Sequence, residues 1–276
     1  MKDNDTHNLK SLALATDLFE TRFCTKVVNR KDYVVFSTPS EPDFFWGNFI
    51  AFYNPPRLED YDLWKEIYKD EFKTKSPKFY TFTWDSSELN QNFVSPFLEN
   101  GFKVEKDITL VTKVPVKTEK YNSSVKICKI SLPDQWEQIP EVHVSKESST
   151  PVKNQMQFVA KRMKAFKKLV DKGYAFRYGA FLDNKLVADL GILFENGLAR
   201  YNLVATHRDF QRQGICQTLI YESALDLKKH VDIKKFVIVA DDNYHAQVVY
   251  KKAGFTAAET NYSLMWWDEN IYGKTL

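Results

Sequence analysis

The sequence predicts a mixed α/β (α+β) fold, a strand-rich sheet flanked by helices, that occurs twice in the chain. Aromatic residues make up 15% of the 276 residues. Phenylalanine and tyrosine dominate them, which favours strands with large core side chains. A similar order of strands and helices recurs on each side of a polar segment at residues 114–124. The length is sufficient for two domains, each with its own core.

The N-terminal half begins with an amphipathic stretch, and several apolar, aromatic-rich segments follow it. Tyr61, Trp64, Ile67, Tyr68 and Phe72 recur at helical spacing, which predicts a helix with one apolar face. The elements expected in this half are a helix at 9–23, extended segments at 26–28, 33–37 and 44–53, a helix at 58–72, a strand at 79–84, a short helix at 88–99 and a strand at 102–114.

The C-terminal half repeats the alternation of strands and helices. Asp183, Asn184 and Lys185 separate two apolar runs and predict a tight hairpin turn. Further on, a polar loop that contains Gly214 joins a strand to an apolar helix. The expected elements are a strand at 125–130, a helical region at 133–148, a helix at 152–172, strands at 174–182, 186–194 and 199–205, a helix at 215–230, a strand at 236–240, a helix at 244–252 and a strand at 260–267.

The two halves also match in sequence at one place. The hexapeptide FLENGF at residues 97–102 corresponds to YKKAGF at residues 250–255. In both, glycine follows a predicted helix, where it can adopt the left-handed conformation that ends the helix. The match and the shared element order favour a duplicated fold. We therefore expect domains at 1–114 and 125–276, joined by a linker at 115–124.

The charge, apolar runs and cysteines of the chain argue against several kinds of partner and binding site. The net charge is only +3 and the basic residues are scattered, so no nucleic-acid partner is expected. No run of 18 apolar residues occurs, so no membrane contact is expected. Cys24, Cys128 and Cys216 are odd in number and far apart, which predicts neither a metal site nor a disulfide framework. These features predict a cytoplasmic protein.

The loop before the predicted helix at 215–230 has the features of an anion site. A strand ends, a polar loop turns, and an apolar helix begins immediately. The backbone N–H groups at a helix N-terminus, together with its dipole, favour a negative ligand. Arg208 and Arg212 would add positive charge, and Gly214 would let a ligand approach the backbone. An ordinary surface loop before a helix has the same spacing, so both readings stay open here.

A second segment follows about thirty residues later. Asn243, Ala246, Tyr250, Gly254 and Phe255 have the spacing N-x-x-A-x-x-x-Y-x-x-x-G-F. Asparagine is a good helix N-cap, and a tyrosine seven residues on lies two turns along the same face. By itself this pattern describes a capped short helix with a buried aromatic residue.

Together the two segments resemble the GCN5-related N-acetyltransferase (GNAT) family. Its coenzyme A loop reads Q/R-x-x-G-x-G/A, and residues 211–216 (QRQGIC) match it except at Cys216, where Gly or Ala is usual. The later motif is matched in full, and the resemblance covers the chain from about Val125. It implies the acyl-CoA N-acyltransferase fold, with a mixed, mostly antiparallel central sheet flanked by helices. It also implies acetyl-CoA as cofactor and transfer of an acetyl group to a primary amine by direct attack.

The resemblance also implies particular site residues. Tyr250 would donate a proton to the departing thiolate. Candidates for the general base are Asp189 and Glu195, with His207 and Asp241 as further possibilities. The sequence is equally compatible with each of them being an ordinary solvated polar residue. Residues expected to bind the cofactor are Leu203, Val204, Ala205, Gln211, Arg212, Gln213, Gly214, Ile215, Cys216, Gln217, Asn243, Ala246 and Tyr250.

The N-terminal half lacks such a loop. Its corresponding segment contains Pro55 and Pro56, which remove backbone donors that a pyrophosphate would need. We expect a degenerate GNAT-like copy there and a catalytic domain at 125–276. The alternative is a non-catalytic acyl-CoA-binding or sensing module with the same fold. The acceptor, a small-molecule or peptide amine, is not specified by the sequence, and neither is the choice between monomer and homodimer.

Overall fold

The computed structural model describes residues 9–21, 25–145, 150–242 and 246–273. Its contacts divide the chain into two compact units, Met1–Thr109 with Glu259–Leu276, and Leu110–Ala258. The sequence placed residues 259–276 in the C-terminal domain, whereas the contacts group them with the first unit. The reason is strand pairing, because residues 263–267 of β11 (Thr256–Trp267) pair antiparallel with β4 (Phe79–Trp84). The expected linker at 115–124 belongs to the second unit.

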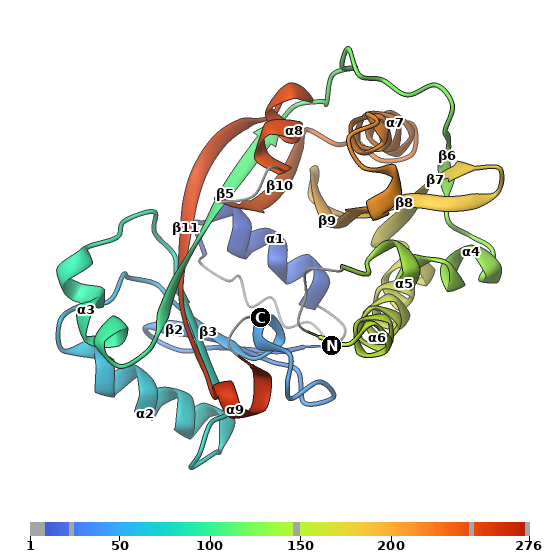
Figure 1. Cartoon of the computed structure of the whole chain (residues 1–276). Helices are drawn as coiled ribbons and strands as arrows, with labels where there is room; N and C mark the ends of the chain where they lie inside the picture. Colours follow the sequence, from blue (N-terminus) through green and yellow to red (C-terminus); the bar gives the residue numbers. More distant parts are fainter. Residues whose placement is uncertain (1–8, 22–24, 146–149, 243–245, 274–276) are drawn as a thin grey trace. The chain divides into compact units, whose positions relative to one another are not determined.

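The first unit contains a sheet in the order β1-β2-β3-β4-β11-β5 (Figure 1). The strands β3 and β4 are parallel, and the pairs β1–β2, β2–β3 and β4–β11 are antiparallel. Its remaining elements are α1 (Leu12–Thr21), β1 (Lys26–Asn29), β2 (Tyr33–Ser37), β3 (Phe49–Phe52), α2 (Asp60–Phe72), α3 (Gln91–Glu99), β5 (Lys103–Thr112) and α9 (Glu269–Tyr272), with a short 3₁₀ turn at Phe45–Gly47.

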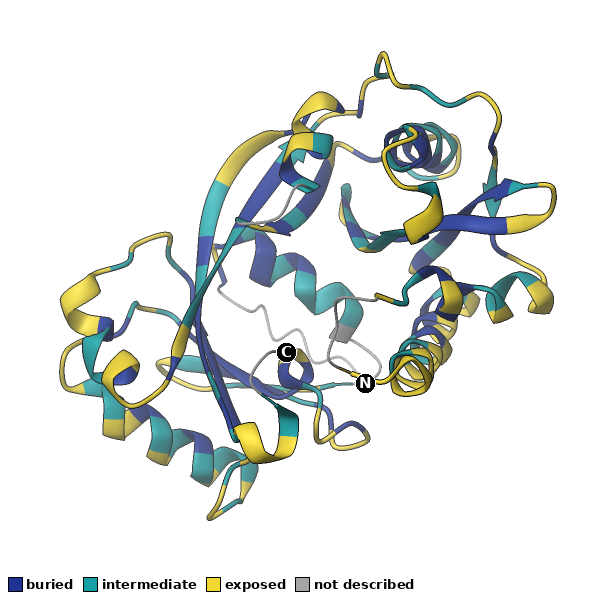
Figure 2. Cartoon of the chain, in the orientation of Figure 1, coloured by how far each residue is buried: buried dark blue, intermediate teal, exposed yellow. Residues whose placement is uncertain are grey.

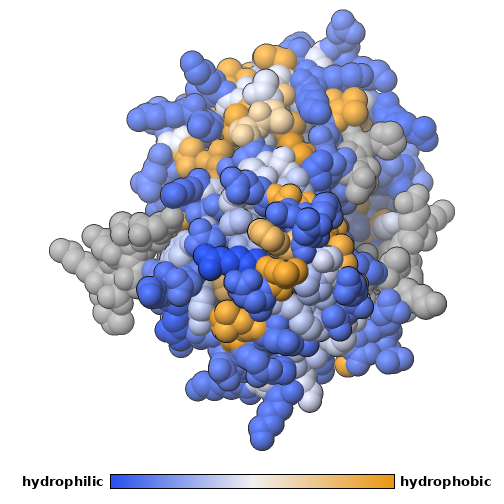
Figure 3. All heavy atoms as spheres, turned by 90° about the vertical axis from the view of Figure 1, so that its left-hand side faces the viewer, coloured by the Kyte–Doolittle hydropathy of each residue, from blue (hydrophilic) through white to orange (hydrophobic). Residues whose placement is uncertain are grey.

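Aromatic side chains fill the core of the first unit. The rings of Phe52 and Trp64 stack with their centroids 3.8 Å apart. Trp64 and Tyr68 of α2 are buried, and Tyr61, Ile67 and Phe72 pack against the same cluster. This confirms the predicted apolar helix face. On the α2 and α3 side, hydrophobic residues occur in small groups among hydrophilic ones (Figure 3).

The repeated hexapeptide forms the same helix end in both units. Gly101 and Gly254 have positive φ angles of 83° and 87°. After α3, the N–H of Phe102 donates to the carbonyl of Phe97 at 3.0 Å, and after α8 (Ala246–Lys252) the N–H of Phe255 donates to the carbonyl of Tyr250 at 3.1 Å. Both are glycine-dependent caps that close orphan carbonyls. The short sequence match therefore corresponds to the same local conformation in both units.

The second unit has the strand order β5-β10-β9-β8-β7-β6. The strands β9 and β10 are parallel, while β6–β7, β7–β8 and β8–β9 are antiparallel. With helices on the sheets, this confirms the predicted mixed, mostly antiparallel fold class. The remaining elements are β6 (Lys126–Lys129), α4 (Pro133–Glu137), α5 (Ile139–Val142), α6 (Val152–Asp171), β7 (Ala175–Leu182), β8 (Lys185–Glu195), β9 (Leu198–Thr206), a 3₁₀ turn at Arg208–Phe210, α7 (Ile215–Lys228) and β10 (Lys235–Asp241).

Helices cover both faces of the second sheet. In Figure 1, α7 lies on one face of β7, β8 and β9, and α5 and α6 lie on the other. Of the strands between them, β7 and β8 are mostly buried, as the dark blue in Figure 2 shows, whereas β9 is mostly half-buried. Gly191 of β8 faces α6, because a Cβ there would meet the Phe166 ring. Side chains at alternate positions of β8, including Asp189, therefore point to the α5 and α6 face.

Some element boundaries differ from expectation. The region expected to be helical at 133–148 forms two short helices, α4 and α5, and α5 ends at Val142. In the tight turn that precedes β8, Asp183 and Asn184 have φ angles of 46° and 66°. Two consecutive positive φ angles are what a type I′ hairpin requires, so the predicted turn is confirmed. Within the described residues, no helix is long and apolar enough to cross a bilayer.

Candidate functional site

The site begins where β9 and β10 separate. The two parallel strands pair over residues 198–200 and 235–237, after which β9 continues to Thr206 and β10 to Asp241. The pairing of β9 with β8 also shifts here, since Asp189 faces Ala205 while Gly191 faces Asn202. The extra residues form a bulge in which Leu203 has a φ of 47°.

The loop after β9 leads directly into α7. Gly214 has a φ of 78° and is the residue immediately before the helix. A Cβ at this position would overlap the carbonyl oxygen of Lys120. Glycine is therefore required both by the left-handed backbone and by the close approach of another chain segment. The first intrahelical bond runs from Thr218 N–H to the Gly214 carbonyl at 3.0 Å, so the preceding N–H groups have no partner within the helix.

A cavity of about 340 Å³ opens beside this loop. It is lined by Lys120, Val204, Ala205, Thr206, Phe210, Gln211, Arg212, Gly214, Ile215, Cys216, Gln217, Ala246, Val248, Val249, Tyr250 and Lys252. Among these described lining residues, Lys120, Arg212 and Lys252 carry positive charge and none carries a carboxylate. The cavity also lies at the N-terminal end of α7, where the helix dipole is positive, and the first turn of α7 contains no acidic residue. These features suit the cavity to an anionic ligand.

Most of the predicted cofactor residues lie together in this cavity. Those that line it are Val204, Ala205, Gln211, Arg212, Gly214, Ile215, Cys216, Gln217, Ala246 and Tyr250. Leu203 forms the bulge at its edge, and Gln213 lines a neighbouring hollow. Asn243 lies outside the described residues, so its predicted contact stays a prediction.

Sequence reasoning missed Lys120, Thr206, Phe210, Val248, Val249 and Lys252 among the lining residues. The helical spacing around Tyr250 could have indicated Val249 and Lys252, which lie on or beside the same turn of α8. Nothing in the local sequence indicates Lys120, because it approaches the loop through the tertiary fold.

Tyr250 of α8 is one of the residues that line the cavity. The residue is buried, with 6% of its surface exposed, and its ring lies 6.3 Å from that of Phe255. The glycine-capped end of α8 fixes this geometry, since Phe255 N–H donates to the Tyr250 carbonyl. A phenol held at the wall of a cavity can donate a proton to a group bound there.

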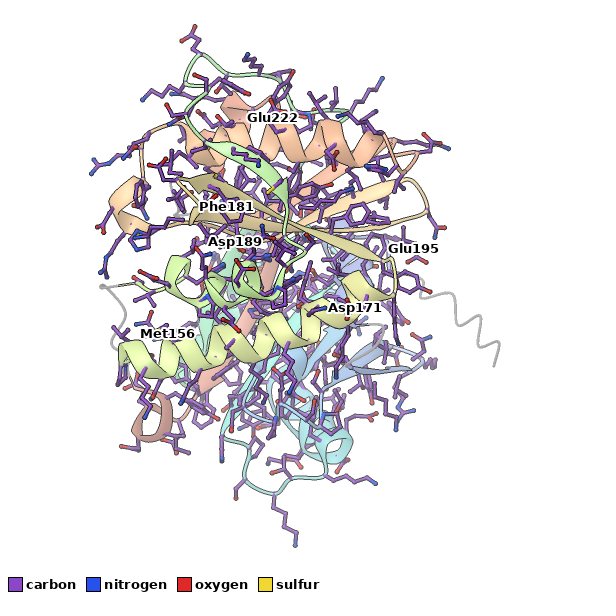
Figure 4. The ribbon with its side chains drawn as sticks, turned by 90° about the vertical axis from the view of Figure 1, so that its right-hand side faces the viewer. Met156, Asp171, Phe181, Asp189, Glu195 and Glu222 are labelled. Atoms are coloured by element: carbon purple, nitrogen blue, oxygen red, sulfur yellow. The ribbon has the colours of Figure 1, made fainter. Side chains whose placement is uncertain are left out.

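Asp189 lies in a buried charge cluster on the α5 and α6 face, where Figure 4 labels it in the interior. Its carboxylate accepts a hydrogen bond from Arg177 Nη2, and the other oxygen lies 2.9 Å from Nε2 of His143. Arg177 also donates to the carbonyl of Leu203 at 3.1 Å, and its side chain, like that of Asp189, is fully buried. The cluster therefore holds the β9 bulge in place.

Glu195 lies six residues further along β8, at the hairpin end of the strand, where it pairs with Leu198 (Figure 4). Neither Glu195 nor Asp189 is among the described residues that line the cavity. Burial and pairing with Arg177 give Asp189 a structural role. The proton-acceptor role stays a prediction for both carboxylates.

The two other candidate bases also lie outside the cavity lining. His207 is buried, and its Nδ1 accepts a hydrogen bond from the Asp209 N–H at 3.3 Å. This contact caps the 3₁₀ turn that begins the loop. Asp241 is exposed at the end of β10. His207 thus shapes the loop that carries the anion site.

Cys216 is expected to be chemically inert despite its place in the loop. Burial raises the pKa of its thiol to about 12. Because the folded pKa is raised, the thiol stays neutral until the pH approaches that value, and at pH 8 roughly one molecule in 10⁴ carries the thiolate. Iodoacetamide should therefore alkylate Cys216 about 100-fold more slowly in the native protein than in denaturant. Peptide mass spectrometry over time would measure both rates, and equal rates would contradict the prediction.

Comparisons with known proteins give a matching family model and several solved structures with a similar fold. Residues 143–266 match the family model described as an acetyltransferase (GNAT) domain. The search of curated proteins found no match. A solved structure of a functionally unknown conserved protein from Staphylococcus epidermidis is 15% identical with a TM-score of 0.68, covering 88% of this chain and 94% of that chain.

Two further solved structures carry family descriptions. A GCN5-related N-acetyltransferase from Kribbella flavida is 13% identical with a TM-score of 0.61, covering 92% of this chain and 94% of its own. A tandem GNAT protein from the clavulanic acid biosynthesis pathway is 12% identical with a TM-score of 0.55, covering 91% and 87%. At these identities the likeness concerns the fold. Each of the three likenesses extends over both halves of the chain.

Proposed function

We propose, on the premise that residues 143–266 form a GNAT acetyltransferase domain, that this protein is an acetyl-CoA-dependent N-acetyltransferase acting on a primary amine. One observation carries the proposal. A single cavity joins the N-terminus of α7, three cationic side chains and the Tyr250 phenol, at the point where two parallel strands separate.

The residues present fit coenzyme A. The N–H groups at the start of α7 are positioned for a pyrophosphate, and Gly214 lets it approach the backbone. Val204, Ala205 and Val249 add an apolar wall for the pantetheine arm. When bound, acetyl-CoA would supply an activated acetyl thioester next to Tyr250.

The chain's own groups would then position the reactants and move protons. Tyr250 would donate the phenolic proton to the sulfur that leaves. Direct attack by a neutral amine gains most of its rate from proximity and orientation. A general base must accept the amine proton, and Glu195 stays a candidate for it. Asp189 is a weaker candidate because Arg177 and His143 already bind its carboxylate.

The first unit is proposed to be a degenerate copy that does not bind coenzyme A in this way. Its parallel strands stay paired to their ends, with Phe52 opposite Trp84 and a further bond from Asp85 N–H to the Phe52 carbonyl at 2.8 Å. Within the described residues 49–85, no gap comparable to that between β9 and β10 follows. Asp60 and Asp62 also lie in the first turn of α2, where they disfavour an anion.

Calorimetric titration with acetyl-CoA tests the proposal. We expect binding of about one equivalent, together with thiol release when a panel of amines is added. The panel would contain an amino acid, a polyamine, an aminoglycoside and a lysine-containing peptide. Binding without thiol release from any amine would favour the acyl-CoA-binding module, and no binding would overturn the proposal. Two equivalents would overturn the role given to the first unit.

Tyr250→Phe is expected to lower kcat about 100-fold, because the variant lacks the proton donor. Its affinity for acetyl-CoA should stay close to that of the wild type, because the ring still fills the same space. Thiol release and calorimetry would measure the two quantities separately. Tyr221→Phe is the control, since Tyr221 is also on the second unit but does not line the cavity. Equal effects of the two substitutions would contradict a role for Tyr250 in proton transfer.

A further inference from the structure

The segment expected to be a linker is part of the site. Asn122 N–H donates to Thr218 Oγ1 at 2.8 Å, and Asn122 Nδ2 donates to the Gln213 carbonyl at 2.9 Å. Thr118 Oγ1 donates to Gln217 Oε1 at 3.2 Å. These contacts pin residues 118–122 to the loop and to the first turns of α7. The position of Lys120 beside Gly214 is therefore fixed by the fold.

A second, more polar hollow lies between this segment and the loop. It has a volume of about 430 Å³ and is lined by Lys120, Tyr121, Asn122, Ser123, Ser124, Arg212 and Gln213. Lys120 and Arg212 also line the cofactor cavity, so the two spaces adjoin at these side chains. The described lining of the hollow includes no carboxylate. Among the residues that the structure describes, neither cation has an ion-pair partner, and both are free to bind a ligand.

We propose that this polar hollow binds the 3′-phosphate of the coenzyme A ribose, with Lys120 and Arg212 as its cationic contacts. The inference rests on the proposed function. Coenzyme A carries two separate anionic groups, the pyrophosphate and the phosphate on the ribose. The start of α7 accounts for the pyrophosphate, whereas the lining of the hollow does not include Tyr250 and combines two cations with hydroxyl donors from Ser123 and Ser124.

The chemistry of the hollow favours a phosphate over the other parts of the cofactor. A phosphate monoester presents three strong acceptor oxygens, and lysine binds it as a compact charge while arginine binds it as a planar fork. An apolar lining would instead suit pantetheine or adenine. Arg212 belongs to the GNAT loop motif, whereas Lys120, Ser123 and Ser124 come from the segment at 118–124, outside the GNAT motifs.

Calorimetry with coenzyme A and with dephospho-CoA, which lacks the 3′-phosphate, tests the inference. The wild type should bind coenzyme A about tenfold more tightly than dephospho-CoA. Lys120→Ala should remove most of this preference, because it should weaken coenzyme A binding much more than dephospho-CoA binding. Arg212→Ala should act in the same direction.

Lys117→Ala is the matched control. Lys117 lies three residues before Lys120, with its ammonium 4.0 Å from the centre of the Tyr121 ring, and it lines neither space. It should leave both affinities unchanged. Thermal melts would verify that each variant is folded, which is expected because the lysines are exposed.

The outcomes separate this inference from the proposed function. Equal affinity of the wild type for the two ligands would overturn the 3′-phosphate site and leave the acetyltransferase proposal standing. An equal loss of both affinities in Lys120→Ala would also overturn it, because the lysine would then serve the pyrophosphate. Failure of the wild type to bind either ligand would overturn both proposals.

Discussion

Gly214→Ala is expected to weaken acetyl-CoA binding by more than about 100-fold. The residue has a φ of 78°, a conformation that costs an L-residue roughly 1–2 kcal/mol. The larger effect is steric, because the added Cβ would overlap the carbonyl oxygen of Lys120. Backbone atoms cannot rotate away as a side-chain end can. Either the loop or residues 118–122 must move, and both belong to the proposed anion site. Calorimetric titration of the two proteins measures the loss.

Gly173→Ala is the control that separates strain from overlap. Gly173 has nearly the same φ, 79°, and an added Cβ there would meet nothing within 4 Å. It also belongs to the second unit, at the end of α6. We expect only the cost in stability of the backbone conformation, about 1–2 kcal/mol, and no change in affinity. Gly214→Asp should be at least as severe as Gly214→Ala because it adds negative charge next to the pyrophosphate position. Near-normal affinity in Gly214→Ala would show that the cofactor binds elsewhere.

The sequence predicted the parts of the site that depend on local backbone chemistry. Gly214, Gly101 and Gly254 all adopt positive φ angles where the sequence placed helix starts or ends. Asp183 and Asn184 form the predicted turn for the same kind of reason. In these cases one residue type and its neighbours fix the conformation, so spacing is sufficient.

Features that depend on pairing at long range were not predictable. The C-terminal strand pairs with β4 over residues 263–267, far from it in sequence, and a hydrophobic alternation does not specify which sheet a strand joins. The segment at 115–124 has the polar composition of a linker, yet Asn122 and Thr118 bind side chains of α7. Polar residues that bind each other have the same composition as solvated ones.

Asp189 shows the same limit in a charged residue. An aspartate on the strand before the loop strand is a reasonable candidate base, since nothing local reveals its partners. The structure places Arg177 of β7 and His143, which follows α5, around its carboxylate. Three elements thus converge on one charge, and only the tertiary fold determines that the carboxylate is paired.

Asp189→Asn is expected to lower the free energy of unfolding by about 3–5 kcal/mol, because it leaves a buried guanidinium without its counter-charge. Arg177 is fully buried, and within the described residues its Nε and Nη1 already lack a hydrogen-bond partner. Denaturant unfolding followed by circular dichroism measures the change. Glu195→Gln is the control on the same strand, outside the buried cluster, and it should change stability by less than about 1 kcal/mol.

The same variant distinguishes a structural carboxylate from a general base. If Asp189 were a general base, Asp189→Asn would lower kcat while stability changed little and cofactor affinity stayed the same. Loss of the ion pair should instead reduce stability and also weaken acetyl-CoA binding, since Arg177 holds the Leu203 carbonyl at the bulge beside Val204 and Ala205. The double variant Arg177→Met/Asp189→Leu should recover much of the stability, because it removes both buried charges together. A stable Asp189→Asn protein with normal affinity and lost turnover would contradict the structural role and assign Asp189 to catalysis.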